Sequence, residues 1–197
     1  MGRKSLKTVR QKEIIKAFYK VARKEGLENA SIAKVAMVLG VNPSLVIHYF
    51  KTKQDLIHGL IEYVLERYLL IYDPQNGTLN PRERLKKIIQ NLFSRKWNKL
   101  FDDGVFYSSF ALVFRNQKIK AHYKNLHDHL RLLLTNALQE AKNGKAIKID
   151  DVENTADLVF VFVEGAYYYL SLVSNKAEYH RRLGIYEERV LRVLDLH

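Results

Sequence analysis

The stretch SIAKVAMVLGVNPSLVIHYFKTKQD, residues 31–55, decides the architecture of this chain. It holds two short apolar segments, which are interrupted at Gly40 and restarted by Asn42 and Pro43. Ser31 and Asn42 are residue types that cap helix starts, and proline is tolerated at the first helical position. We therefore predict two short helices joined by a tight turn at Gly40, where glycine accepts a positive φ.

The length of the second helix suits a DNA groove. A helix over residues 43–50 is about 12 Å long, and the major groove of B-DNA is about 12 Å wide. In a helix-turn-helix the first helix braces the second, and the second enters that groove. Val46 and Phe50 would anchor the second helix to the core. The side chains left pointing outward are Asn42, Pro43, Ser44 and His48.

Positive charge is concentrated in the same part of the chain. Residues 1–60 hold 12 Lys and Arg against 4 Asp and Glu, whereas the remainder holds 21 against 17. A concentrated positive field favours a polyanion, most often nucleic acid and less often an anionic membrane surface. A solvated, solubilising face is the alternative.

Composition excludes several other classes of protein. The 197-residue chain has no cysteine, so it has no disulfide, thiolate zinc site or cysteine nucleophile. The basic N-terminus lacks the apolar segment of a secretory signal. The most apolar run, residues 158–173, is interrupted by Glu164 and is shorter than a membrane span, so we expect it to be a helix that is buried all round. These features predict a cytoplasmic protein with no membrane partner.

Helix signals recur along the whole chain, while alternating strand patterns are absent. A capping box at Thr8 predicts a helix that ends at Gly26, and another at Thr52 predicts a helix reaching about Tyr72. We predict an all-α fold, with an N-terminal three-helix helix-turn-helix domain joined to a larger C-terminal helical bundle. The remaining helices are expected near residues 82–96, 105–116, 118–142, 151–173 and 185–195.

The stretch DPQNGTLNP, residues 73–81, is the best candidate for a boundary because it gathers Pro, Gly and Asn. We predict a DNA-binding helix-turn-helix domain over residues 1–52 and a connecting helix with linker over residues 53–75. A ligand-binding and dimerisation domain would occupy residues 76–197.

The block from Gln11 to about Leu65 resembles the DNA-binding domain of TetR-family transcriptional regulators. The features that carry the resemblance are the serine that opens the second helix, the Gly-Val turn, the aromatic pair that ends the third helix, and the capped lysine in Phe50-x-x-Lys53. Beyond residue 75 the resemblance rests only on length and helical character. A helical hairpin in an unrelated all-α domain is the alternative interpretation.

The resemblance implies specific contacts with DNA. Ser31 would meet a phosphate from the start of the second helix, and Lys53 would meet one from the start of the fourth, where the helix dipole adds to its charge. His48 or Tyr49 would reach the backbone. The residues that would approach base edges or flanking phosphates are Asn42, Pro43, Ser44 and Leu45.

One position departs from the family pattern. Ile47 stands where the family usually has tyrosine, so this side chain cannot donate a hydrogen bond and the backbone clamp would move to Tyr49. Pro43 and Leu45 leave few side chains able to bond bases in bidentate fashion. Sequence readout would then depend on Asn42, Ser44, methyl contacts and DNA shape.

Aromatic side chains are dense over residues 97–114, where Phe106, Phe110 and Phe114 would lie on one helical face. Aromatics at this spacing are more often core than ligand site. The functional alternative is an apolar cavity with a few polar groups that binds a small molecule. The candidate ligand-binding residues are Phe106, Tyr107, Phe110, Phe114, Tyr123, Glu164 and Tyr168.

Glu164 is the one charge within residues 158–173, and burying a carboxylate is costly unless it is paired or protonated. Its partner would be an internal base such as Arg115 or His122, a tyrosine network at a subunit interface, or a cationic or hydroxyl-bearing ligand. We favour the internal base because it requires no further molecule.

Catalytic and metal sites have no support. His122, His127 and His129 place no pair on adjacent turns of one helical face, so we expect no metal. Because no nucleophile–base grouping or Gly-rich phosphate loop stands out, we predict no catalytic residue and no cofactor. A small helical enzyme with an aromatic pocket is the corresponding rival.

Together these features predict a homodimeric transcriptional regulator, which would be a repressor released from its operator by an unknown small-molecule effector. The operator would be a near-palindromic site in double-stranded DNA, because two copies of the reading helix would enter successive major grooves. The apolar-rich helices near residues 118–142 and 151–173 suit a subunit interface, because the second is apolar nearly all round. The second would equally be the central helix of its domain, and the two interpretations are compatible. The alternative is a basic helical module that binds nucleic acid or anionic membrane without sequence specificity.

Overall fold

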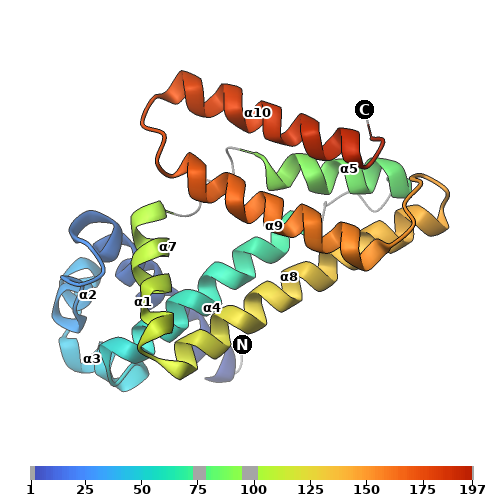
Figure 1. Ribbon diagram of the computed structural model, residues 1–197. Helices are drawn as coiled ribbons and strands as arrows, with labels where there is room; N and C mark the ends of the chain where they lie inside the picture. The colour runs from blue at the N-terminus through green and yellow to red at the C-terminus, as the bar shows by residue number, and fades with distance from the viewer. Residues whose placement is uncertain (1–2, 73–78, 95–101, 197) are drawn as a thin grey trace. The chain divides into compact units, whose positions relative to one another are not determined.

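A computed structural model describes residues 3–72, 79–94 and 102–196 of the chain (Figure 1). Within these ranges every regular element is a helix, which confirms the predicted all-α fold class. Most of the predicted boundary stretch, residues 73–78, and the start of the aromatic-rich segment lie outside the described residues. The chain divides into two compact units, which are described separately.

The first unit combines residues 1–67 with residues 101–126. Its core is formed by large buried side chains such as Phe18, Leu56 and Leu60. Its elements are α1 (Arg3–Glu25), α2 (Ile32–Leu39), α3 (Pro43–Tyr49), most of α4 (Lys53–Tyr72), α7 (Asp103–Phe110), the 3₁₀ helix η1 (Ala111–Phe114) and the first turns of α8 (Gln117–Asn143).

The start of α1 corrects one prediction. The helix begins at Arg3, five residues before the predicted cap at Thr8. Arg, Lys and Leu are strong helix formers, so the preceding residues extend the helix instead of ending it. The predicted end is right, because Gly26 follows the last helical residue with a φ of +85°.

The helix-turn-helix forms through the predicted caps. The Ser31 Oγ accepts a hydrogen bond from the backbone N–H of Lys34, at 3.3 Å. Gly40 ends α2 with a φ of +65°, and Asn42 caps α3 with Pro43 in its first turn. The axes of α2 and α3 are bent by 113°, within the range typical of a helix-turn-helix.

The start of α4 is fixed by a reciprocal capping box. The backbone N–H of Thr52 donates to the Asp55 carboxylate at 2.9 Å, and the N–H of Asp55 donates to the Thr52 hydroxyl at 3.1 Å. These bonds satisfy two donors that a helix start leaves unpaired. The predicted helix from this cap to Tyr72 is confirmed.

The second unit combines residues 68–100 with residues 127–197. It contains the end of α4 and most of α8. Its remaining elements are α5 (Pro81–Leu92), α9 (Val152–Leu170) and α10 (Lys176–Val193). No single helix among the described residues is both long and apolar enough to cross a membrane.

Several helix limits differ from the prediction. The helix predicted over residues 82–96 ends at Leu92, and the one predicted from residue 185 begins at Lys176. The early start of α10 has a local cause, because the Asn175 side chain accepts hydrogen bonds from the N–H groups of Ala177 and Glu178. The segment predicted as one helix over residues 105–116 divides into α7 and η1.

The expectation that residues 158–173 are buried all round is wrong. Val159, Val163 and Leu170 are buried, but the opposite face of α9 is open to solvent. That face carries Leu158, Val161 and Tyr168, and Leu172 follows the end of the helix; these four side chains are 56–68% exposed. One side of the helix is enough to complete the core of the second unit, and the other side is left uncovered.

Candidate nucleic-acid interface

The first turn of α3 presents the polar side chains of the helix-turn-helix to solvent. Asn42, Pro43, Ser44 and His48 are exposed, while Val46 and Phe50 are buried and fix the helix to the core. Leu45 and Tyr49 are half-buried. The arrangement gives α3 one anchored face and one open face, as a helix that enters a DNA groove requires.

The Asn42 side chain has two separate chemical roles available to it. Its Oδ1 accepts from the backbone N–H of Ser44 at 2.9 Å and from the Ser44 hydroxyl at 2.8 Å. This oxygen is therefore occupied by the cap. The amide Nδ2 remains as a donor, which suits an acceptor such as a phosphate oxygen or the O6 and N7 atoms of guanine.

The end of α3 is partly apolar. Ile47 is 46% exposed and offers no hydrogen bond. The His48 and Tyr49 rings meet edge to face with centroids 5.0 Å apart. This contact restrains both aromatic side chains, which keep a ring nitrogen and a hydroxyl for polar contacts.

Lys53 lies at the start of α4, where its ammonium has an intramolecular partner. The Nζ donates to the backbone carbonyl oxygen of Glu28, at 2.7 Å. This bond ties α4 to the loop that precedes α2. Because an ammonium carries three donors, two hydrogens remain for a phosphate oxygen.

Sequence patterns did not single out Lys51 and Met37, which the structure leaves at the surface of the same segment. Lys51 is exposed between the end of α3 and the cap of α4, so it adds a positive charge beside the reading helix. Met37 is 80% exposed on α2. The position of Lys51 between the aromatic pair and the capping box was the available signal, whereas nothing in the sequence marked Met37.

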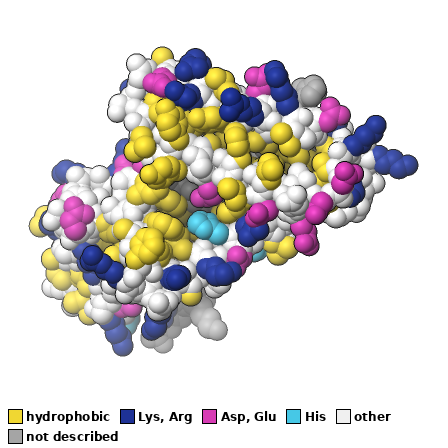
Figure 2. Space-filling model, viewed as in Figure 1, with side chains coloured by type: hydrophobic (Ala, Val, Ile, Leu, Met, Phe, Trp, Pro, Cys, Tyr) yellow, Lys and Arg dark blue, Asp and Glu magenta, His cyan; other side chains and the backbone are white. Residues whose placement is uncertain are grey.

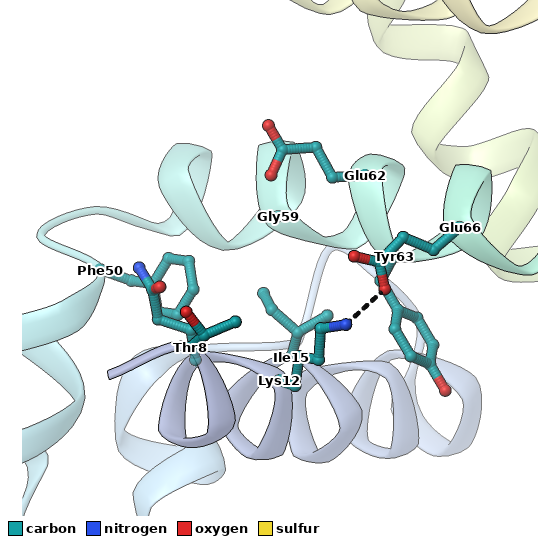
Figure 3. A pocket seen from close by; sticks show the side chains of 9 residues that line it. Thr8, Lys12, Ile15, Phe50, Gly59, Glu62, Tyr63 and Glu66 are labelled. Carbon is teal, nitrogen blue, oxygen red and sulfur yellow. Dashed lines mark ion pairs between the residues drawn. The ribbon is translucent and has the colours of Figure 1, made fainter. Parts of the chain in front are cut away.

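A groove of about 160 Å³ separates α1 from α4 within the first unit (Figure 3). Its floor is formed by Ile15, Phe50 and Gly59, and its rim carries Lys12, which pairs with Glu66 at 2.9 Å. A Cβ atom on residue 59 would lie 2.7 Å from the Ile15 Cδ1. The glycine therefore permits the close approach of the two helices.

The candidate ligand-binding residues divide between the two units. In the first unit, the Phe106 and Phe110 rings pack edge to face against Tyr123, and Tyr107 meets Phe106 in the same way. The hydroxyl of Tyr123 shares a buried hydrogen bond of 2.7 Å with Ser109. Tyr123 is buried, whereas Phe106, Tyr107 and Phe110 are half-buried, so these rings pack together but are only partly covered.

The predicted neighbourhood of Phe106, Phe110 and Phe114 is found, because the centroids of successive rings lie 6.4 Å and 6.2 Å apart. The single helix predicted for them is not, since the α-helix ends at Phe110 and Phe114 ends the 3₁₀ helix that follows. Phe114 is 82% exposed.

In the second unit, Glu164 and Tyr168 lie on α9, where Tyr168 is 62% exposed. Glu164 is solvent-accessible, yet the protein around its carboxyl removes enough water to raise its pKa to about 7. Burial, and then the charge of Glu164, raise the pKa of Tyr72. The carboxyl and the phenol are therefore neighbours.

Within the described part of the second unit, Glu164 has no hydrogen bond or ion pair. The two bases proposed as its internal partners, His122 and Arg115, belong to the first unit, where His122 contacts His58 and Arg115 is exposed. The internal base, a tyrosine network at an interface and a bound ligand all stay predictions.

Hydrophobic side chains gather over α9 and α10 on the face shown in Figure 2. The exposed apolar residues of these helices and their connection include Val161, Leu172 and Val193. A Cβ atom added at Gly165 would meet nothing within 4 Å. Exposed apolar side chains that gather in one place mark association sites.

Comparison with known proteins finds a family match for the helix-turn-helix region and another for the C-terminal region. A family model described as "Bacterial regulatory proteins, tetR family" matches residues 14–60, and one described as "Tetracyclin repressor-like, C-terminal domain" matches residues 80–196. The nucleoid occlusion factor SlmA of Aliivibrio fischeri strain ATCC 700601 / ES114 is 28% identical over 167 residues. The match covers 80% of this chain and 82% of that protein.

Solved structures share the fold over nearly the whole chain. A TetR transcription regulator from Haloarcula marismortui has a TM-score of 0.83 at 17% identity, covering 95% of this chain and 97% of that one. A transcriptional regulator from Saccharomonospora viridis, solved in complex with choline, has a TM-score of 0.72 at 14% identity. That match covers 93% of this chain and 96% of the other.

Proposed function

Because the chain belongs to the TetR family of DNA-binding transcription regulators, we propose that it acts as a homodimeric repressor that a small-molecule effector releases from a near-palindromic operator. The observation that carries this proposal is the open face of α3 in a properly capped helix-turn-helix. The enzyme alternative loses its basis, since the family consists of DNA-binding regulators.

DNA reading is supported by the chemistry of the exposed side chains. We propose that Ser31, Asn42, Pro43, Ser44, Leu45, His48, Tyr49 and Lys53 form the DNA surface, with Lys51 as an additional phosphate contact. Asn42 offers its Nδ2 as a donor to base edges, whereas Lys51 and Lys53 offer positive charge to phosphates. Few of these groups read bases in bidentate fashion, so DNA shape would contribute to specificity.

The exposed apolar face of α9 supports dimerisation. We infer that a second copy of the chain covers this surface. In a dimer with two-fold symmetry, Leu158, Val161 and Leu172 of both copies would be buried together. Two copies place two reading helices on one DNA molecule. This arrangement accounts for the expected near-palindromic operator.

An effector site is supported by Glu164 and Tyr72 in the second unit. A carboxyl whose pKa is raised, beside a phenol, suits a cationic or hydroxyl-bearing ligand. The Saccharomonospora viridis neighbour was solved with choline, a quaternary ammonium compound, which makes small organic cations the first class to test. An effector releases DNA only if it binds the non-reading state more tightly.

Nucleoid occlusion is the second candidate function, because SlmA proteins are named for that role and match most of this chain. In that case DNA binding would serve the nucleoid and need no releasing effector. Binding of nucleic acid without sequence preference is the further alternative.

Selection of bound fragments from random double-stranded DNA tests the proposal. The expected result is a near-palindrome with half-sites about 34 Å apart, one helical turn, or a multiple of that spacing. Sequences enriched no further than the starting pool would overturn specific reading. With the selected site in hand, release of DNA by small organic cations supports a repressor with an effector, whereas binding unaffected by any compound class favours the SlmA-like role.

A further inference from the structure

Two histidines join α4 to α8 within the first unit. The Nδ1 atoms of His58 and His122 lie 3.2 Å apart, and the two rings meet edge to face with centroids 5.0 Å apart. Both side chains are half-buried. A hydrogen bond at this distance requires one Nδ1 to carry a proton and the other to offer its lone pair.

The protonation state of the pair decides whether this bond exists. When at most one ring is charged, one Nδ1–H donates and the other Nδ1 accepts. When both rings are imidazolium ions, both Nδ1 atoms carry protons, no acceptor remains, and two positive charges repel each other. The contact between the helices is therefore attractive on one side of a titration and repulsive on the other.

The surroundings set where that titration falls. Burial, and then the charge of His122, lower the pKa of His58, and Lys118 on α8 acts in the same direction. Asp55 and Glu62 on α4 oppose the shift but do not cancel it. The second proton therefore enters the pair at a lower pH than it would enter an ordinary histidine.

The position of His58 connects the pair to DNA reading. His58 lies on the same helix as Lys53, whose Nζ is bonded to the loop before α2. The neighbouring Gly59 packs against Ile15 of α1 and Phe50 at the end of α3. A change in how α4 is held by α8 is thus transmitted to the elements that position the reading helix.

A second bond between α1 and the residue that caps α7 does not share this sensitivity. The backbone N–H of Asp102, which caps α7, donates to the hydroxyl of Tyr19 on α1 at 2.8 Å. Burial raises the pKa of Tyr19, so the phenol stays neutral throughout the physiological range. Of these two bonds, the one between the histidines is the one that protonation changes.

We propose that the His58–His122 hydrogen bond is an acid-released latch, which holds α4 against α8 near neutral pH and opens when both imidazoles are protonated. Opening loosens α4 and weakens DNA binding. The effect on DNA rests on the proposed function, whereas the opening itself can be measured without DNA.

Hydrogen exchange of the full-length protein, corrected for intrinsic rates, measures the opening at about pH 7.5 and about pH 5.5. His122→Asn is the informative variant, because an amide can occupy the place of Nδ1, keep a hydrogen bond and not titrate. We expect acid to lower the protection of amides 53–64 several-fold in the parent and much less in His122→Asn. His129→Gln, which removes an exposed histidine on α8, should behave as the parent does.

Two results would overturn the latch, and a third would overturn its coupling to DNA reading. Equal acid sensitivity in the parent and His122→Asn would show that the pair does not control α4. Zn²⁺ protection of the parent at neutral pH that His122→Asn abolishes would make the pair a metal site. In the third, acid opens α4 in the parent, but the affinity for the selected DNA falls no more in the parent than in His122→Asn. This result would refute the coupling to DNA reading and would leave sequence-specific binding unaffected.

Discussion

At the scale of single residues, Asn42 caps α3 with its side-chain oxygen, and its amide nitrogen is the group that we propose to read DNA. The Oδ1 caps α3 through Ser44, and Nδ2 is left for DNA. Asn42→Asp keeps the capping oxygen but removes the donor, so we expect unchanged thermal stability and altered base preference at one position per half-site. Asn42→Ala should also lose about 1 kcal/mol of stability. Unchanged preference in Asn42→Asp, measured by repeated selection, would move readout elsewhere on α3.

Lys53 has both a structural bond and a charge that can reach DNA. Lys53→Ala should weaken binding to specific and random DNA about equally and reduce the salt slope by about one, because one phosphate contact is lost. Loss of the bond to Glu28 should cost a further ~0.5–1.5 kcal/mol of stability. Titrations over a range of salt concentrations measure the slope. A slope equal to that of the parent would confine Lys53 to its structural role.

Glu164 gives a pH dependence whose sign follows from its raised pKa of about 7. The unfolded chain ionises this carboxyl near 4.5, so stability from the protonated folded form is present below that pH and is lost as pH rises toward 7. We expect Glu164→Gln to melt at a higher temperature than the parent at about pH 8 and at a similar temperature near pH 4.5. Equal melting temperatures at both pH values would mean that the carboxyl is fully hydrated.

At the scale of elements, the contact between α1 and α4 depends on Gly59. Gly59→Ala would bring a Cβ atom within 2.7 Å of Ile15 and 3.1 Å of Phe50, so the helices must move apart. We expect a loss of ~1–3 kcal/mol in urea unfolding, as for other overpacked cores. Gly184→Ala on α10 is the matched control, because nothing lies within 4 Å of its Cβ position, and it should be neutral or stabilising. A loss in the control equal to that in Gly59→Ala would contradict the steric explanation.

At the scale of the whole molecule, we propose that the open face of α9 forms the dimer interface. Val161→Glu places a charge in the proposed interface, and we expect a monomer at micromolar concentration with much weaker binding to a two-half-site operator. Leu132→Glu changes an exposed leucine on α8 and should remain dimeric. Sedimentation and DNA titration of both variants provide the test. A Val161→Glu protein that stays dimeric would place the interface on another surface.

The sequence by itself determined the helix-turn-helix, because Ser31, Gly40 and Asn42 act on backbone groups within a few residues of themselves. The capping box at Thr52 and the all-α class could be predicted for the same reason, because helix caps and helix propensity act over a few neighbouring residues. Two predicted helix starts were wrong because a neighbouring signal was stronger. The helix propensity of the residues before Thr8 extends α1 to Arg3, and the cap at Asn175 starts α10 well before residue 185.

Only the tertiary structure decided which side of each helix is covered and which distant groups meet. Lys53 and Glu28 are 25 residues apart in sequence, and His58 and His122 are 64 apart, so no local pattern could pair them. Hydrophobic periodicity shows that α9 has apolar positions all round, but the number of neighbours that pack against it determines which are buried. Burial and long-range pairing depend on how many elements the folded chain can bring to one place, and that is a property of the packing rather than of any single segment.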